Sequence, residues 1–154
     1  MKKKLDSIDR QILAILQRDA ETPLADMAQA VNLSTTPCWK RIKEMEAQGV
    51  ITGYTVQVDR KKVGLNLMVM AEINLAQHTD KIVAAFEAAV AATPQIVRCY
   101  STTGQADYVL TIMAADIEQY EQLLIRQLFK LPGVAHVRSS IVLREIKADG
   151  QLPV

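Results

Sequence analysis

Residues 33–46 have the sequence LSTTPCWKRIKEME, which predicts a short helix that presents its N-terminal end and a basic edge. Ser34 is a typical N-cap residue, and Pro37 suits the first helical turn, where an N–H group has no helical partner. Three basic residues then precede the first acidic one: Lys40, Arg41 and Lys43. A helix of this design is suited to bind a polyanion.

The two segments before this stretch predict the helices that support it. Apolar residues recur at helical spacing over residues 5–16, with Asp6 as the expected N-cap and Asp9 in the first turn. Residues 24–31 predict a second, shorter helix, and Asn32 begins the turn that leads to the third. Two short helices joined by a tight turn form a helix-turn-helix, whose second helix enters the major groove of DNA.

The outward side of the third helix is the expected contact surface for DNA, because Ile42 and Met45 point inward at helical spacing. N–H groups and hydroxyls at a helix start can hold phosphates or reach base edges, and basic side chains make such binding depend on salt. The predicted DNA-contacting residues are Ser34, Thr35, Thr36, Pro37, Trp39, Lys40, Arg41 and Lys43. Each feature alone is also typical of an ordinary solvated helix, but together they favour DNA.

A strand is predicted after this helix, because apolar residues alternate over residues 50–59 behind Gly49, the expected C-cap. Residues 60–65 form a basic turn, which we expect to be a solvated linker that can also touch flanking phosphates. The predicted organisation is a winged helix-turn-helix domain over residues 1–50, a strand hinge over residues 51–66 and a second domain over residues 67–154.

The second domain repeats the order strand, helix, strand. Strands are expected over residues 67–75, 96–101, 107–114 and 134–146, with helices that start near Thr79 and Asp116. This order predicts a ferredoxin-like βαββαβ domain of the α+β class, with both helices on one face of an antiparallel sheet. Both faces of the strands carry apolar residues, so the open face needs a cover, and a second copy of the sheet would supply it.

The remaining motifs give no sign of an enzyme. His78 and His136 lie in unlike settings without metal-ligand or triad spacing, and the turn at Gly104 lacks the further glycines of a phosphate-binding loop. We therefore expect no metal and no cofactor. The sequence has no apolar run long enough for a membrane span, and Cys38 and Cys99 are too few for a disulfide framework, which favours the cytoplasm. Both thiols are expected to pack as small apolar groups, with thiol sensing left open.

Four stretches resemble the Lrp/AsnC family, the leucine-responsive or feast/famine regulators: residues 6–16, 33–42, 49–54 and 104–108. The resemblance covers essentially the whole chain. It implies a bacterial or archaeal transcription factor that binds double-stranded DNA through its N-terminal module. It also implies dimers that assemble further, often to octamers, and a small ligand, usually an amino acid, bound by the C-terminal module.

The turn at residues 102–108 is the predicted ligand site, in which backbone groups near Gly104 meet a carboxylate and Asp107 meets an ammonium group. The resemblance places the pocket between dimers and adds a second wall from the last strand. The predicted effector-binding residues are Thr103, Gly104, Asp107, Tyr108, Ser139 and Ser140. From the residues alone, a plain hairpin explains the turn equally well, with Gly104 at a positive φ and Asp107 as a cap.

The sequence thus predicts a sequence-specific DNA-binding transcriptional regulator that a small molecule modulates. Two alternatives stay open at this point. The protein could be an architectural DNA-binding protein without a ligand, or a ferredoxin-like small-molecule-binding domain whose N-terminal helices have no DNA role. The acid-free basic run at residues 40–43 argues against the second alternative.

Overall fold

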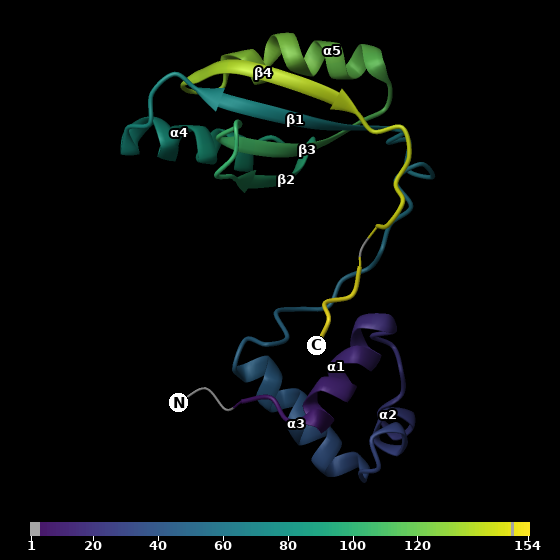
Figure 1. Ribbon diagram of the computed structural model, residues 1–154. Helices are drawn as coiled ribbons and strands as arrows, with labels where there is room; N and C mark the ends of the chain where they lie inside the picture. Colours follow the sequence, from purple (N-terminus) through teal and green to yellow (C-terminus); the bar gives the residue numbers. More distant parts are fainter. Residues whose placement is uncertain (1–3, 149) are drawn as a thin grey trace. The chain divides into compact units, whose positions relative to one another are not determined.

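A computed structural model describes residues 4–148 and 150–154, which divide into two units (Figure 1). The first unit combines the chain up to Gln57 with residues from Lys147 onward, and the second spans Val58–Ile146. The chain therefore passes from the first unit to the second and then returns. Among the described residues, no helix has the length and apolar character to cross a membrane.

Three helices build the first unit: α1 (Ser7–Arg18), α2 (Leu24–Ala30) and α3 (Thr35–Ala47). The predicted N-cap of α1 is confirmed as a capping box. The Asp9 N–H donates to Asp6 Oδ1 at 2.9 Å, and the Asp6 N–H donates to Asp9 Oδ2 at 3.2 Å. Asn32 turns the chain between α2 and α3 with a φ of 56°, which an asparagine side chain tolerates well.

The predicted ends of α3 are also confirmed. Ser34 occupies the N-cap position, although its side chain makes no capping hydrogen bond. At the other end, Gly49 adopts a φ of 70° and donates its N–H to the Glu46 carbonyl at 3.0 Å. The Val50 N–H donates to the Met45 carbonyl at 2.9 Å, and these two bonds together form a Schellman motif.

The core of the first unit lies between α1, α2 and α3. Ile12 and Cys38 are fully buried in it, and Ala28 is the small residue at the contact of α2 with its neighbours. Cys38 therefore packs as a small apolar group, and this burial raises the pKa of its thiol. The returning segment joins this unit through Gln17, whose side-chain amide exchanges two hydrogen bonds with the backbone of Leu152, at 2.7 and 3.2 Å.

The prediction of a strand over residues 50–59 is wrong. No described residue between α3 and Leu67 belongs to a strand, so the wing of the predicted winged helix-turn-helix does not form in the single chain. The alternating apolar residues are present but exposed, with Val56 at 80% and Val58 at 62% of full exposure. A strand requires a hydrogen-bonding partner, and within the described part of the chain residues 52–58 make no backbone hydrogen bond to another segment.

The second unit has the predicted ferredoxin-like order. Its elements are β1 (Leu67–Leu75), α4 (Asp80–Ala91), β2 (Ile96–Ser101), β3 (Tyr108–Ala114), α5 (Ile117–Arg126), a short 3₁₀ turn η1 (Leu128–Lys130) and β4 (Val134–Ile141). The antiparallel strand order is β2-β3-β1-β4, and β4 ends five residues before the predicted limit. Thr79 and Asp116 cap α4 and α5 as expected.

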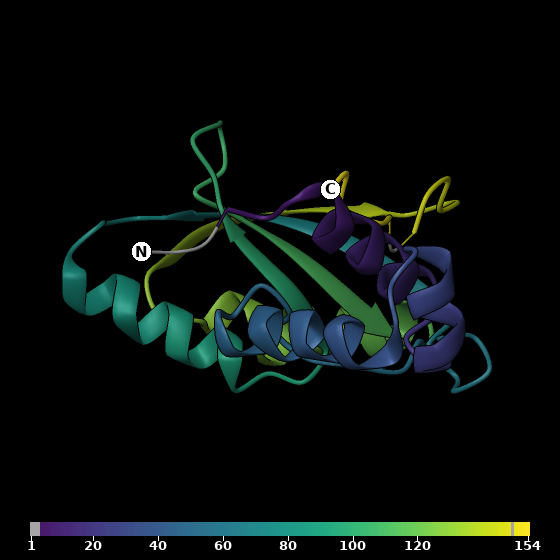
Figure 2. The ribbon, with the colours of Figure 1, turned by 90° about the horizontal axis from the view of Figure 1, so that it is seen from below.

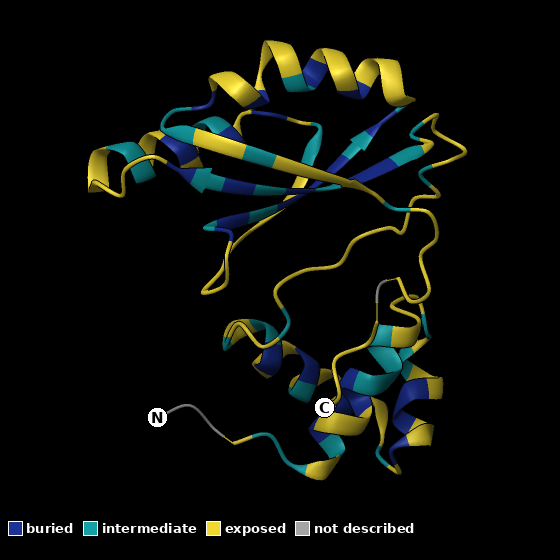
Figure 3. Cartoon of the chain, turned by 45° about the horizontal axis from the view of Figure 1, so that its top comes forward, coloured by how far each residue is buried: buried dark blue, intermediate teal, exposed yellow. Residues whose placement is uncertain are grey.

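One face of the sheet is buried against both helices. Val69, Ala71 and Ile73 alternate along β1 and pack with Phe86 of α4 and Leu123 of α5 in one core cluster. Figure 3 shows buried residues along β1 and β3, whereas exposed residues follow the outer side of α5. The chain's own helices therefore account for the apolar residues on one face of the sheet.

The opposite face of the sheet, which we call the open face, has an apolar centre that no helix covers. Met68 pairs with Met113, and Met70 pairs with Thr111, in adjacent rows of β1 and β3. The Thr111 hydroxyl lies 3.6 Å from the Met70 sulfur. At the β4 side of this face, the Arg138 guanidinium lies 3.5 Å from the Glu72 carboxylate, so the apolar centre has a charged margin.

Gly133 makes the tight corner that leads into β4. Its φ is 73°, and a Cβ at this position would overlap the Ile82 side chain of α4. The Gly133 carbonyl also accepts a hydrogen bond from the Ala76 N–H at 2.8 Å. The corner therefore needs glycine both for its backbone conformation and for its close approach to α4.

We expect Gly133→Ala to lower the free energy of unfolding by about 2 kcal/mol or more. The new Cβ would strain the backbone at a positive φ and would also overlap the Ile82 side chain. Urea unfolding followed by circular dichroism measures the change. Gly104→Ala is the matched control in the same unit, since that glycine has no positive φ and open space around it. Equal stability of the two variants would contradict this account of the corner.

Candidate functional site

The outward side of α3 carries six of the eight residues that the sequence predicts to contact DNA. Ser34, Thr35, Thr36, Trp39, Lys40 and Lys43 are exposed. The first turn of α3 contains no acidic residue, so the positive end of the helix dipole is not neutralised there. Pro37 is half-buried at the helix start. The arrangement gives a surface of hydroxyls, N–H groups, one indole and two lysines on one helix.

Arg41 differs from its neighbours, because its guanidinium is turned toward α1. Nη1 lies 2.7 Å from Asp6 Oδ2 and 2.7 Å from Asp9 Oδ1. The Asp9 side chain is only 5% exposed, so this cation neutralises an almost fully buried carboxylate. The Asp9 backbone N–H and the Arg41 guanidinium lower the pKa of Asp6 to about 2, and both carboxylates raise the pKa of Arg41.

The orientation of Arg41 was missed in the sequence, although a signal for it exists. Arg41 stands three residues after the buried Cys38 and four before the buried Met45, so helical spacing places it near the inner side. Lys40 has no such relation to the buried positions. The structure therefore divides the basic run into a residue that holds α3 in place and residues that remain on its surface.

Lys43 lies on the surface but already has an anionic partner. Its Nζ is 2.7 Å from Glu46 Oε2, and the Tyr54 hydroxyl donates to Glu46 Oε1 at 2.9 Å. These two contacts lower the pKa of Glu46. Lys43, Glu46 and Tyr54 line a shallow cavity of about 320 Å³ together with Trp39, whose side chain is half-exposed.

The predicted ligand turn, residues 102–107, projects from the sheet as a narrow loop between β2 and β3 (Figure 2). The Thr102 N–H donates to the Asp107 carbonyl at 2.9 Å and closes the loop. The Asn74 side-chain amide donates to the Gln105 carbonyl at 2.7 Å and ties the loop to β1. Gly104 does not have a positive φ, so that part of the plain-hairpin explanation is wrong.

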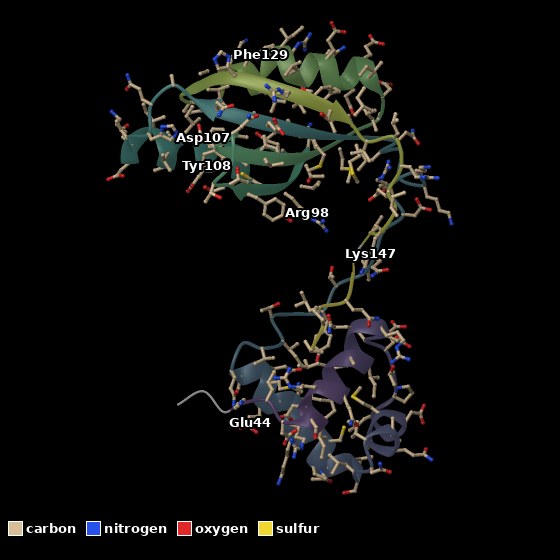
Figure 4. All side chains as sticks on the ribbon, viewed as in Figure 1. Glu44, Arg98, Asp107, Tyr108, Phe129 and Lys147 are labelled. Carbon is tan, nitrogen blue, oxygen red and sulfur yellow. The ribbon has the colours of Figure 1, made fainter. Side chains whose placement is uncertain are left out.

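Asp107 is held at the base of this loop, at the same end of the sheet as Tyr108 (Figure 4). Its Oδ2 accepts a hydrogen bond from the Leu75 N–H at 2.8 Å, and its Oδ1 lies 2.9 Å from Nε2 of His78. The Leu75 N–H and, to a smaller extent, His78 lower the pKa of Asp107. Asp107 Oδ2 therefore ties the base of the loop to the end of β1 instead of capping the turn, and Oδ1 faces an exposed imidazole.

Sequence reasoning did not connect His78 with this site. His78 follows β1, whereas Asp107 precedes β3, and 29 residues separate them. Only the pairing of β1 with β3 brings the two side chains together, and no local pattern indicates that pairing. The structure adds His78 to the candidate ligand site.

The other predicted ligand residues do not converge on the loop within one chain. The Tyr108 ring packs on Phe86 with centroids 4.6 Å apart, and its hydroxyl donates to Glu87 at 3.1 Å. Ser139 shares a hydrogen bond with the Tyr120 hydroxyl on the helix side, whereas Ser140 pairs with Met70 and points to the open face. Thr103, Gly104 and Asp107 are therefore the predicted residues that the loop brings together.

Two cavities lie near the candidate ligand loop. One of about 360 Å³ lies over β1 and β4 and is lined by Glu72, Asn74, Gln105, His136, Val137 and Arg138. Another of about 370 Å³ lies between α4 and β2 and includes Cys99 and Tyr108 in its wall. Within residues 4–148 and 150–154, no cluster of histidine, cysteine and carboxylate side chains is arranged to hold a metal ion.

Comparisons with known proteins cover both units. Residues 5–46 match the AsnC-type helix-turn-helix domain, and residues 68–152 match the Lrp/AsnC ligand binding domain. The DNA-binding transcriptional activator DecR of Escherichia coli is 35% identical over 150 residues, which cover 97% of this chain and 99% of DecR. The leucine-responsive regulatory protein of Haemophilus influenzae is 38% identical over 145 residues, with 94% and 87% of the two chains covered.

Solved structures show the same arrangement of elements. A transcriptional regulator from Neisseria meningitidis, solved as a complex with L-Met, superposes with a TM-score of 0.93 at 29% identity over 97% of each chain. An AsnC family transcriptional regulator from Agrobacterium tumefaciens superposes with a TM-score of 0.92 at 36% identity, again over 97% of each chain.

We expect Arg41→Ala to lower the thermal midpoint of the first unit by several degrees at pH 7, because it leaves the buried Asp9 carboxylate without its cation. Fluorescence of Trp39, the single tryptophan, reports on this unit. The folded state lowers the pKa of Asp6, so the stabilisation is complete above about pH 4 and is lost as pH falls toward 2.

The difference between wild type and Arg41→Ala should therefore shrink across that acidic range. Lys40→Ala, one position away on the exposed side of α3, is the control and should leave the midpoint nearly unchanged. A difference that stays constant down to pH 2 would argue against the ion pairs as its cause.

Proposed function

This chain belongs to the Lrp/AsnC family of transcriptional regulators, and on that premise we propose that α3 reads double-stranded DNA while the βαββαβ unit binds an amino acid that modulates the reading. The observation that carries the proposal is that the two sides of α3 have different roles. Arg41 and the buried residues hold the helix, and the opposite side presents hydroxyls and lysines without an acidic residue in the first turn.

The proposed DNA contacts come from the start and the outer edge of α3. Ser34, Thr35 and Thr36 are suited to phosphates and base edges, and Pro37 shapes the helix start that carries them. Trp39 is suited to apolar contact with sugar or a thymine methyl group, and Lys40 supplies an exposed cation on the outer side of α3. Lys43 contributes once a phosphate replaces Glu46 as its partner.

We assign Arg41 a positioning role in place of the predicted DNA contact. Moving its guanidinium to a phosphate would leave Asp9 buried and unpaired, at a cost that one exposed phosphate contact does not offset. Arg41 therefore acts on DNA binding through the position of α3.

The proposed effector is an amino acid held at the loop that contains Thr103, Gly104 and Asp107. A carboxylate with one outward oxygen is suited to an ammonium group, and the loop N–H groups near Gly104 are suited to a carboxylate. The complex of the Neisseria meningitidis relative with L-Met and the leucine response in the name of the Haemophilus influenzae relative support this ligand class. Tyr108, Ser139 and Ser140 lie outside the loop and would act in the assembled protein.

We further propose that two chains pair through the open face of the sheet. Met70 and Met113 are partly exposed beside the buried Met68 and form an apolar centre that a second copy can cover. The charged margin of Glu72 and Arg138 can fix the register of the two copies. A dimer supplies two copies of α3 for a two-fold-symmetric operator, and further assembly of dimers follows the family. We also propose that the protein acts as a regulator without enzymatic activity and works in the cytoplasm, where its proposed DNA target lies.

Lys40→Ala should weaken binding to DNA from upstream of the protein's own gene by roughly three- to tenfold and reduce the slope of log affinity against log salt by about one. Fluorescence anisotropy at salt concentrations between about 50 and 300 mM measures both the affinity and its dependence on salt. Lys81→Ala on α4 is the control for loss of a lysine outside α3. Unchanged affinity and slope in Lys40→Ala would remove Lys40 from the reading surface.

Met70→Asp should convert the dimer into a monomer at micromolar concentration, because the substitution places a charge in the centre of the paired open faces. Sedimentation velocity measures the mass. Ile125→Asp replaces an exposed apolar residue of α5 and should leave the dimer intact. A Met70→Asp variant that is folded by circular dichroism and still dimeric would show that the chains pair elsewhere.

A further inference from the structure

The side chain of Asp107 is fixed in position by the backbone around it. Its own N–H donates to the Ile73 carbonyl at 3.0 Å, and its carbonyl accepts from the Thr102 N–H at 2.9 Å. Its Oδ2 accepts from the Leu75 N–H at 2.8 Å. The carboxylate cannot turn away without breaking its hydrogen bond to the Leu75 N–H at the end of β1. Only Oδ1 is left to face outward.

That outward oxygen is occupied by His78. Nε2 of His78 lies 2.9 Å from Asp107 Oδ1, and the two side chains are 59% and 28% exposed. His78 belongs to the short connection between β1 and α4. Among the residues that the structure describes, Asp107 is the charged partner of this imidazole, and Asp80 in the first turn of α4 is the nearest other acid along the chain.

We propose that His78 competes with the ligand's ammonium group for Asp107 Oδ1 and thereby sets how strongly the amino acid binds and how that binding depends on pH. This inference rests on the proposed function, in which Asp107 receives the ammonium group. Two cations at one carboxylate oxygen repel each other, so a charged imidazole opposes the ligand. A neutral imidazole is a weaker partner for the carboxylate and yields its place.

The competition links ligand binding to one proton. Histidine side chains change charge between about pH 5 and 8. A free amino acid keeps both its ammonium group and its carboxylate charged between about pH 5.5 and 7.0, so the charge of the ligand stays constant there. The fraction of protein that is competent to bind then rises with pH, and the apparent affinity rises by the same factor.

Isothermal titration calorimetry on the full chain with L-methionine and L-leucine tests the proposal. Wild type should bind more tightly as pH rises. His78→Ala should bind more tightly than wild type at pH 5.5, by about five- to tenfold, and should show little dependence on pH. His136→Gln is the matched control, because it removes the other of the chain's two histidines, and it should keep the wild-type dependence on pH.

A fourth variant separates the failure of this inference from the failure of the proposed function. Asp107→Asn keeps an acceptor for the Leu75 N–H and removes the charge, so it should fold and lose amino-acid binding. If Asp107→Asn loses binding while His78→Ala keeps the wild-type dependence on pH, the role of His78 is overturned and the ligand site stands. If Asp107→Asn binds like wild type, or if wild type binds neither amino acid, both are overturned.

Discussion

The position of α3 depends on the carboxylate of Asp9, which is almost fully buried and must have a cation beside it. Burial of an unpaired carboxylate would cost several kcal/mol, so the pairing with Arg41 contributes to the stability of this unit. The same pairing ties the start of α1 to the middle of α3 through Asp6. The helix that we propose to read DNA is thus held by charge as well as by its apolar side, and Thr35, Thr36 and Lys40 remain exposed on its outward side.

Local patterns in the sequence were sufficient for most of the fold. The capping box at Asp6, the Schellman motif at Gly49 and the repeated strand-helix-strand order each depend on neighbours within a few residues. The direction of Arg41 and the separation of Ser139 from Ser140 could also have been read from helical and strand periods. The contact of His78 with Asp107 could not, because it requires the order of strands in the sheet.

The strand predicted over residues 50–59 failed for a related reason. Alternation of apolar residues describes what a segment is suited to do, whereas a strand also needs a second segment beside it. The open face of the sheet presents a related situation, because Met70 and Met113 remain partly exposed there in one chain. Both features indicate that a single copy of this chain leaves backbone groups and apolar side chains that a second copy could pair with.

The hydrogen bonds between Gln17 and Leu152 have a mechanical consequence. Because residues from Lys147 onward belong to the first unit, the ligand-binding unit is inserted in the DNA-binding unit and is joined to it by two covalent connections. Loss of the Gln17 contact would remove the side-chain anchor of the returning segment, so we expect the C-terminal residues to fray from the first unit.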